Sequence, residues 1–172
     1  MMDITTYDSR WPADFEAERA RLARALGPLA LRIDHHGSTS VPGLDAKPII
    51  DIQISVAELH PMAAYRGSLL ALSYVHVPHA DDAVCPYFHR PADWPHTHHV
   101  HVVQAGGDAE RRTLAFRDFL RDHADVAREY AALKAQLARG VDEASFLSQQ
   151  EYADAKGPFI ERIIQRALAE GY

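Results

Sequence analysis

The stretch from His35 to Val56 contains the residue types best suited to chemistry. It reads HHGSTSVPGLDAKPIIDIQISV, which is a glycine turn, a loop and then a strand that carries one carboxylate at Asp51. Phosphate and metal sites are often built in this order, because a turn presents backbone N–H groups and a neighbouring strand presents an acid. The stretch therefore predicts a phosphate site at Gly37 and Ser38, and a catalytic and metal-binding role for Asp51.

Residues 48–56 alternate in the manner of a strand with one buried face. Successive side chains of a strand point to opposite faces, so one face is apolar and β-branched and should pack on helices. The other face places Asp51 beside Gln53. An unpaired buried carboxylate is costly, so Asp51 should meet a metal ion, a cation or an open cleft. Pairing with an arginine at a sheet edge is an alternative that the residue by itself leaves open.

The loop between Gly37 and the strand is rich in glycine and small hydroxyl residues. Ser38 and Thr39 are candidate phosphate donors, although many loops share this composition. Lys47 follows the loop and precedes the strand, so its ammonium group could bind phosphate or balance the charge of Asp51. We therefore add Thr39 and Lys47 to the predicted phosphate or nucleotide site.

Lysine is rare in this chain, which has three lysines among its 18 basic residues. An ammonium and a guanidinium group do not exchange freely at a fitted site, so the three lysines are worth following. Lys134 and Lys156 lie in the helical half and could close over the open face of the sheet. We prefer the simpler interpretation for these two, in which they are solvated and their stems cover apolar helix surface. For Lys47 we prefer a functional role.

A second strand pattern, at 97–104, carries a cluster of histidines. His99 and His101 share one face, and two histidines at this spacing can reach a single metal ion. If this strand neighbours the first, both histidines face Asp51, while His98 points to the helix-covered side. An Asp-His-His set suits zinc, manganese or iron better than magnesium. The alternative is a surface strand with incidental histidines.

The remaining elements follow from helical spacing and turn residues. An apolar stripe predicts a helix that begins near Trp11 and is capped by Asp8 or Ser9. Ser148 and Glu151 form a capping box that is typical of the start of a last helix. The other expected elements are strands at 29–35, 73–77 and 84–89, a helix at 58–72, and two helices between 108 and 140.

Composition bounds the class of protein. A length of 172 residues suits one domain, with a sheet-rich part at about 1–105 and a helical part at about 106–172. The net charge of −6 argues against non-specific nucleic-acid binding, which needs a basic face. One cysteine permits no intrachain disulfide. No run reaches the roughly 18 apolar residues of a membrane span, and no signal-peptide pattern is present. We expect a cytoplasmic protein that does not bind membranes.

Motifs along nearly the whole chain resemble the GrpB family, also catalogued as the uncharacterised family UPF0157. They occur in the family's order, so the resemblance is specific. The matching motifs are Asp34–Gly43 (DHHGSTSVPG), Lys47–Ile52 (KPIIDI), Thr97–His101 (THHVH), Phe116–Leu120 (FRDFL), Tyr130-x-x-Leu-Lys134 and Tyr152-x-x-x-Lys156-x-x-Phe159.

That family is similar to the nucleotidyltransferase superfamily. The resemblance implies an α+β fold, with a nucleotidyltransferase-like mixed β-sheet, helices on one face and a C-terminal helical segment. The superfamily signature is a Gly-Ser turn followed by an acid–apolar–acid strand, whose carboxylates hold divalent metals. Here Gly37-Ser38 and Asp51 fit this signature. Gln53 replaces the second acid, and an amide is a weaker metal ligand than a carboxylate.

The preferred function is a nucleotidyltransferase-like protein that binds a nucleotide or phosphorylated small molecule with a divalent metal ion, which would be Mg, Mn or Zn. The metal ligands would be Asp51, Gln53, His99 and His101. A non-catalytic nucleotide-binding or phosphate-binding protein on the same fold is one alternative. A metal-dependent hydrolase that uses Asp51, His99 and His101 is another. The family also occurs joined to dephospho-CoA kinase, which implies a coenzyme A or nucleotide context.

Overall fold

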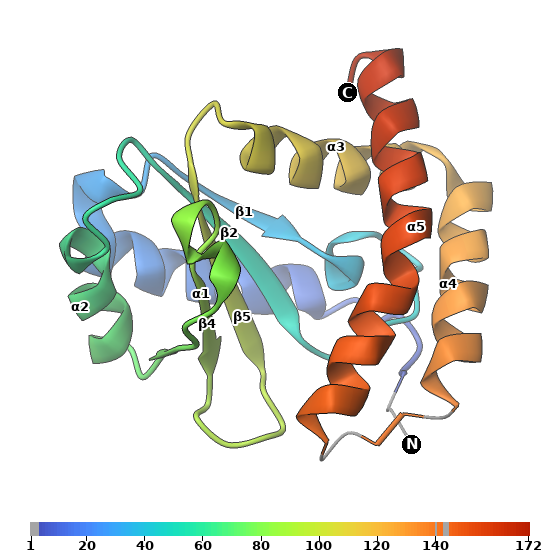
Figure 1. Cartoon of the computed structure of the whole chain (residues 1–172), viewed down its shortest axis with the longest axis horizontal. Helices are drawn as coiled ribbons and strands as arrows, with labels where there is room; N and C mark the ends of the chain where they lie inside the picture. The colour runs from blue at the N-terminus through green and yellow to red at the C-terminus, as the bar shows by residue number, and fades with distance from the viewer. Residues whose placement is uncertain (1–3, 140, 143–144) are drawn as a thin grey trace.

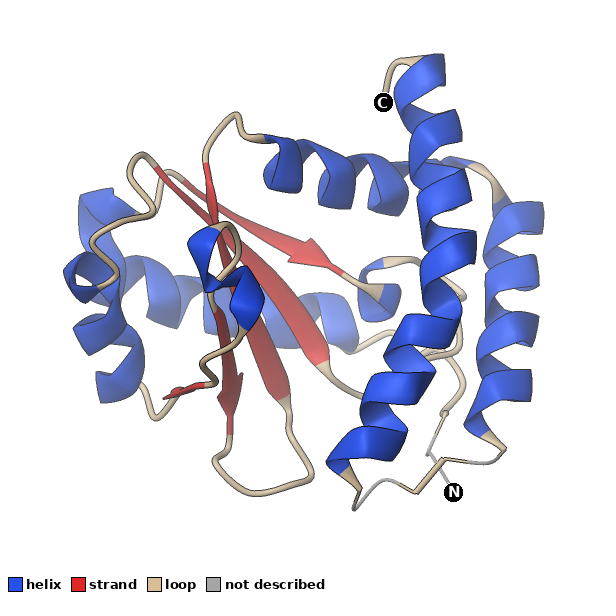
Figure 2. Cartoon of the chain, viewed as in Figure 1, coloured by secondary structure: helices blue, strands red, loops and turns tan. Residues whose placement is uncertain are grey.

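The computed structural model describes residues 4–139, 141–142 and 145–172, and its centre is a five-stranded mixed sheet with helices packed against it (Figures 1 and 2). The strands occur in the spatial order β1-β2-β5-β4-β3. Only β2 and β5 are parallel, and the other neighbours are antiparallel. The strand bounds are β1 Arg32–His36, β2 Ile50–Val56, β3 Val75–His76, β4 Tyr87–Arg90 and β5 His98–Gln104.

Five α-helices accompany the sheet in the described residues. α1 and α2 cover one face of the sheet, and α3, α4 and α5 form the helical segment on the other side (Figure 2). None of the described helices is long and apolar enough to cross a membrane. The helix bounds are α1 Trp11–Leu26, α2 Ala63–Ala71, α3 Asp108–Asp122, α4 Ala124–Ala138 and α5 Phe146–Glu170. The short 3₁₀ turns are η1 Gly27–Leu29, η2 Ser38–Ser40 and η3 Ala80–Ala83.

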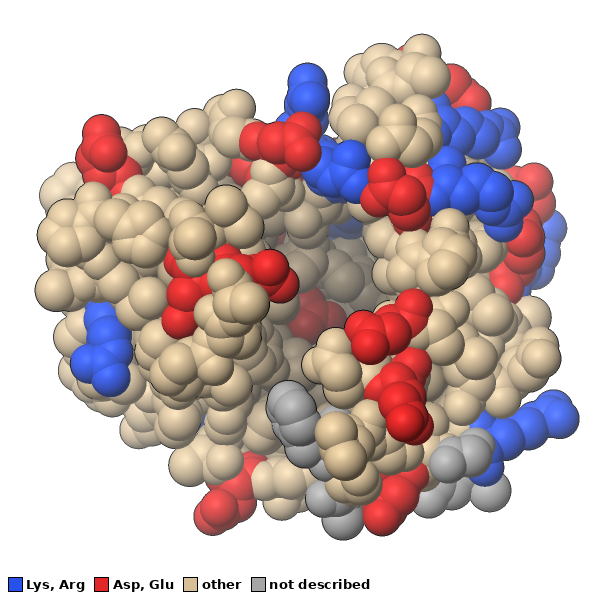
Figure 3. Space-filling view, viewed as in Figure 1, with Lys and Arg blue, Asp and Glu red and all other residues tan. Residues whose placement is uncertain are grey.

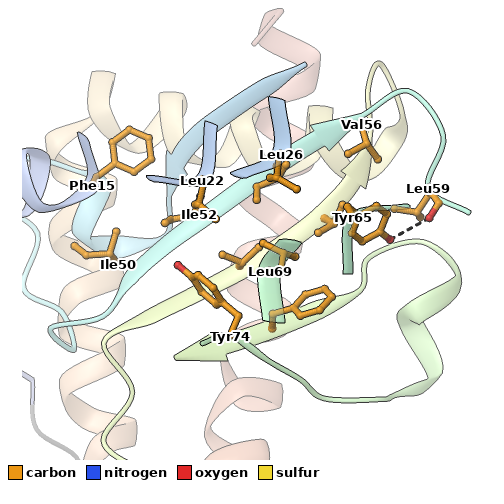
Figure 4. Close-up of a cluster of buried hydrophobic side chains, with 14 of the residues drawn as sticks. Phe15, Leu22, Leu26, Ile50, Ile52, Val56, Leu59, Tyr65, Leu69 and Tyr74 are labelled. Atoms are coloured by element: carbon orange, nitrogen blue, oxygen red, sulfur yellow. Dashed lines mark hydrogen bonds between the residues drawn. The ribbon is translucent and has the colours of Figure 1, made fainter. Parts of the chain in front are cut away.

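The apolar face predicted for β2 forms the main core with α1 and α2 (Figure 4). Ile52 and Leu22 are completely buried there, and the Tyr65 hydroxyl donates a hydrogen bond of 3.0 Å to the carbonyl of Leu59. Burying such side chains contributes roughly 1.5–3 kcal/mol each. This core holds β2 rigidly, so the side chains on its opposite face have fixed positions.

The opposite face of the sheet is partly covered by α3. The Ser55 hydroxyl donates a hydrogen bond of 2.5 Å to the carboxylate of Glu110. The guanidinium group of Arg117 lies 3.5 Å from the carboxylate of Asp34. A second apolar cluster joins α3, α4 and α5 to the loop after β1, through Val41 and others. The helical segment therefore closes one end of this face.

Several predicted boundaries differ from the structure. The first helix has Arg10 as its N-cap with no side-chain cap, because the Asp8 carboxylate accepts from the backbone and side chain of Arg10 instead. The predicted strand at 29–35 begins only at Arg32, and the Leu31 side chain is exposed. The last helix begins before the predicted capping box, and Ser145 caps it by accepting from the Ser148 backbone N–H.

Candidate functional site

The site is built where the turn after β1 meets the first residues of β2. Gly37 has a φ of +66°, and a Cβ atom placed there would lie 2.2 Å from Oδ2 of Asp51. No side chain fits at such a distance, so only glycine allows the turn to approach the carboxylate. The structure therefore confirms the expectation that the turn at Gly37 lies against the Asp51 side chain, while the binding roles of both residues stay predictions.

The turn itself uses one of the predicted phosphate donors for its own structure. Thr39 is buried, and its hydroxyl donates a hydrogen bond of 3.0 Å to the carbonyl of Ile49. The same oxygen lies 3.0 Å from Nε2 of His35, so its hydrogen-bonding capacity is used internally. The structure therefore places Thr39 under the turn, on the core side. We retain Ser38 but not Thr39 as a candidate phosphate donor.

The histidine strand lies beside Asp51 in the expected orientation. β5 pairs with β2 so that His99 is opposite Asp51 and His101 is opposite Gln53. Nδ1 of His99 lies 3.3 Å from Oδ1 of Asp51. His98 points to the helix-covered face, where Nδ1 lies 3.1 Å from Nη2 of Arg90. The register predicted by strand alternation is confirmed, while the ligand roles stay predictions.

Aromatic and imidazole rings surround the carboxylate. The Tyr87 ring is 5.3 Å from the ring of His99 and 5.1 Å from that of His101. His36 contacts His101 edge-on at 5.1 Å, and Nδ1 of His96 lies 3.2 Å from Nε2 of His99. Neither His36 nor Tyr87 was predicted to join Asp51, His99 and His101 on this face of the sheet, which we call the floor of the site.

Burial sets the charges of this floor. It lowers the pKa of His101 to about 3, with a further reduction from His36, and it lowers the pKa of His36 as well. Burial by itself would raise the pKa of Asp51. The hydrogen bond with His99 and the neighbouring imidazoles outweigh burial and hold that pKa below its usual value. The floor therefore presents the Asp51 carboxylate beside the neutral imidazoles of His36 and His101.

Gln53 occupies the position of the second acid and is sealed from the solvent. Its side chain is 1% exposed, and both of its amide atoms lack a hydrogen-bond partner. Its neighbour in β1 is Asp34, which contacts Arg117 of α3. A metal ligand at this position would need access that the packing of α3 does not give. The prediction of Gln53 as a ligand does not agree with this geometry.

The donor set does not fit the metal centre that the sequence implies. Within residues 4–139, 141–142 and 145–172, no group of three His, Cys, Asp or Glu side chains is arranged to hold one metal ion. Divalent metals that act on phosphates are held by one or two carboxylates together with the phosphates themselves. Here Asp34 is paired with Arg32 and Arg117, and one oxygen of Asp51 already contacts His99. We derive no chemistry through a metal ion.

Lys134 reaches the turn from α4 and is almost fully buried. Its ammonium group donates a hydrogen bond of 2.9 Å to the Ser38 hydroxyl and one of 2.5 Å to the carbonyl of Asp45. It also lies 4.9 Å from the ring centre of Tyr130. The expectation of a solvated lysine is therefore wrong for Lys134. Burial lowers its pKa to about 7, with a further contribution from Lys156.

The other two lysines meet above one tyrosine. Nζ of Lys156 lies 4.2 Å from the ring centre of Tyr152, and Nζ of Lys47 lies 5.5 Å from the same centre. Lys47 is also 5.2 Å from the ring centre of Trp94. Burial lowers the pKa of Lys156 to about 8, Lys47 lowers it further, and Asp51 opposes the shift. The three lysines of the chain thus converge on the surroundings of Asp51.

The surface is hollowed on this side of the molecule (Figure 3). The hollow lies between the strands and α5, and acidic side chains line part of its rim. We call the cluster formed by Asp51, Ser38 and the three lysines the lysine cleft; the side chains of Asp51 and His99 are 26% and 20% exposed there. Its residues come from the turn, β2, α4 and α5, which are distant in the sequence.

The lowered pKa of Lys134 predicts a pH-dependent contribution to stability. The unfolded group keeps its ordinary pKa of 10.5, so between about pH 7 and that value the unfolded chain binds more protons than the folded one. Stability should therefore rise with pH through this window. In the Lys134→Met variant this gain disappears. The difference in melting temperature, variant minus parent, should fall as the pH is raised from the lower to the upper part of the window.

The control is Arg128→Met, which removes an exposed cation from the same helix. The difference in melting temperature between this control and the parent should not depend on pH in this window. Equal pH dependence for the two variants would contradict a buried, partly neutral Lys134. The charged groups that act on Lys134 are Lys156, which repels it, and Asp45 and Asp51, which attract it.

Comparison with known proteins identifies relatives over nearly the whole chain. The family model described as GrpB protein matches residues 1–166. UPF0157 protein YqkA of Bacillus subtilis is 38% identical over 80% of this chain, which spans 40% of the length of YqkA. UPF0157 protein BH1888 of Halalkalibacterium halodurans is 38% identical over 96% of this chain and 82% of that protein. A dephospho-CoA kinase of Mycobacterium leprae is 31% identical over 95% of this chain and 46% of that protein.

Solved structures agree with the fold. The crystal structure of the conserved protein GrpB from Enterococcus faecalis superposes with a TM-score of 0.85 at 33% identity, and the match covers 98% of each chain. A structure of Cid1, described by its RNA terminal uridylyl transferase activity, superposes with a TM-score of 0.53 at 14% identity, over 83% of this chain and 44% of that one. The second likeness shows a nucleotidyltransferase-type fold and nothing about activity.

Proposed function

Because the chain belongs to the GrpB family and has a nucleotidyltransferase-type fold, we propose that it binds a nucleotide or another phosphorylated small molecule in the lysine cleft. The observation that carries this proposal is the convergence of Lys47, Lys134 and Lys156 beside Ser38 and Asp51. Lys156 and the partly charged Lys134 both interact electrostatically with Asp51, and their positive charge would attract an anionic ligand.

The local contacts favour phosphate among anions. The Ser38 hydroxyl lies at the end of the turn, held by Lys134. Lysine acts toward phosphate as a compact point charge, and Lys47 and Lys156 carry such charges on flexible stems. The rings of Trp94 and Tyr152 lie beside these ammonium groups, so a planar base could stack near them. This combination of charge and aromatic surface suits a nucleotide.

Nucleotidyl transfer is a second candidate, supported by the fold and by the position of Asp51. In that reaction an acceptor hydroxyl attacks the α-phosphorus, the bond from that phosphorus to the leaving oxygen breaks, and pyrophosphate departs with the electron pair. Asp51 would accept the proton that the attacking hydroxyl loses. Gln53 stands in the position of the second acid, and its neighbour Asp34 is paired with Arg32 and Arg117, so this candidate is the weaker of the two. A hydrolase that uses Asp51, His99 and His101 is weaker still, since these side chains form no three-ligand metal group.

Thermal-shift measurements with a panel of nucleoside triphosphates and inorganic pyrophosphate test the binding proposal. A ligand that binds only the folded state should raise the melting temperature. At a ligand concentration one hundred times its dissociation constant, the free energy of unfolding rises by about 2.7 kcal/mol. Calorimetric titration of the best probe then gives its affinity. If no phosphorylated probe binds at any concentration tested, the proposal fails.

The Lys47→Arg variant tests whether the cleft needs a compact ammonium group. Arginine keeps the charge but replaces a point charge by a planar fork, and Lys47 is fitted between the Trp94 and Tyr152 rings. We expect weaker binding of the best triphosphate probe, by about tenfold, with little change in melting temperature. If the variant matches the parent in both measurements, an ammonium group is not required at this position.

A further inference from the structure

We propose that the lysine cleft binds the phosphates of its ligand directly, through the ammonium groups of Lys47 and Lys156, without a divalent metal ion as a bridge. This inference rests on the proposed function and adds to it the form of the ligand, which is the metal-free anion. It departs from the metal requirement that the sequence pattern implies, because the residues on the floor of the cleft do not fit that requirement.

The first reason is the number of carboxylates. A metal-bridged phosphate site uses one or two carboxylates together with the phosphates themselves to hold the cation. Two acids lie on this face of the sheet: Asp51, which contacts His99, and Asp34, which is opposite Gln53 and pairs with Arg32 and Arg117. At the position of the second acid, Gln53 has no charge and is 1% exposed. A cation at Asp51 would therefore have a single carboxylate to hold it.

The second reason is the charge already present. Lys134 donates to Ser38, and Lys156 and Lys47 stand over the same tyrosine ring. Asp51 interacts electrostatically with both Lys134 and Lys156, so the ammonium groups and the carboxylate belong to one site. A divalent cation placed here would be repelled by the charged lysines in a partly buried setting, although burial keeps Lys134 partly neutral near pH 7. A phosphate group would be attracted by the same groups.

The two reasons make a specific prediction for the form of the ligand. Mg²⁺ bound to a triphosphate removes part of its negative charge and occupies phosphate oxygens. Direct contact with lysine ammonium groups needs those oxygens and that charge. The free triphosphate should therefore bind more tightly than its magnesium complex. A metal-bridged site would show the opposite order.

The test is calorimetric titration of the full chain with ATP and with inorganic tripolyphosphate, once with EDTA and once with excess magnesium chloride. Ionic strength is matched with choline chloride, because salt screens such attractions. We expect binding in EDTA and affinity weaker by about tenfold with magnesium. Binding that appears only with magnesium overturns the metal-free inference and leaves the proposed function intact. Absence of binding under both conditions overturns the proposed function itself.

The Asp51→Asn variant supplies an independent readout. It keeps the size of the side chain and an acceptor for His99, but removes the negative charge beside the lysines. If the ligand contacts the lysines directly, this change should tighten the binding of ATP in EDTA, since one repulsive charge is lost. If the ligand is held through a metal at Asp51, the change should abolish binding. The melting temperature of the variant confirms that it is folded.

Discussion

The Gly37→Ala variant is expected to be strongly destabilised and to lose ligand binding. Two costs add at this position. A non-glycine residue at the φ of +66° costs roughly 1–2 kcal/mol. The added methyl group would lie 2.2 Å from Oδ2 and 2.8 Å from Cβ of Asp51, and overpacking of this kind costs roughly 1–3 kcal/mol. The total of about 2–5 kcal/mol should lower the melting temperature by about 4–20 °C for a chain of this size.

The loss of binding has its own cause. Relief of the clash requires that the turn moves away from β2 or that the Asp51 side chain rotates. Either movement changes the separation of Ser38 and Asp51, which together border the lysine cleft. Calorimetry with the best triphosphate probe, at a temperature where the variant is still folded, should therefore show weaker binding than in the parent.

Gly43→Ala is the matched control for this experiment. Gly43 also has a positive φ, of +78°, but a Cβ atom there would have no neighbour within 4 Å. The control should show only the conformational cost of roughly 1–2 kcal/mol and should bind the probe as the parent does. If the two variants are destabilised equally and bind equally, the close approach of Gly37 to Asp51 has no role in stability or binding.

The Lys156→Met variant is expected to produce the largest loss of affinity that does not come from unfolding. Lys156 is half-buried on α5, and its ammonium group lies 4.2 Å from the Tyr152 ring centre. A charge-assisted hydrogen bond contributes roughly 1.5–3 kcal/mol, so its removal should weaken triphosphate binding by about ten- to hundredfold. Methionine keeps an unbranched apolar stem against the ring, which preserves the packing of α5.

The melting temperature of Lys156→Met should not fall in proportion. The lowered pKa of Lys156 shows that burial and Lys47 oppose its charge in the folded protein, and replacement of a buried charge by an apolar group is often neutral or stabilising. Arg162→Met is the control, since it removes an exposed cation of α5 that pairs with Glu129. This control should bind as the parent does. Equal losses of affinity in both variants would show that α5 contributes only net charge.

Strand alternation accounts for what could be predicted about the floor of the cleft. The placement of Asp51 and Gln53 on one face of β2, and of His99 and His101 on one face of β5, follows from a period of two residues that the backbone imposes locally. A one-residue error would have reversed every side chain, and the register that the structure shows agrees with the pattern. The glycine at position 37 likewise reflects a local backbone requirement.

Helix and strand ends were less predictable, because caps depend on competing local partners. Asp8 has the residue type of a cap, but its carboxylate bonds to Arg10 and leaves the first helix without a side-chain cap. Ser148 has the spacing of a capping box, yet Ser145 caps α5 three residues earlier. Several serines and acids near a helix start can each perform this role, and the sequence pattern does not rank them.

The sequence by itself determined the family resemblance, the two polar strand faces and the rarity of lysine. It could not show that the three lysines meet, since Lys134 and Ser38 are separated by 96 residues and approach only because α4 packs against the turn. Nor could it show that Gln53 is sealed, since that depends on how β1 and α3 cover its end of the sheet. Local pattern fixes the direction of a side chain along its own strand, while access and charge at a site depend on elements that other parts of the chain bring to it.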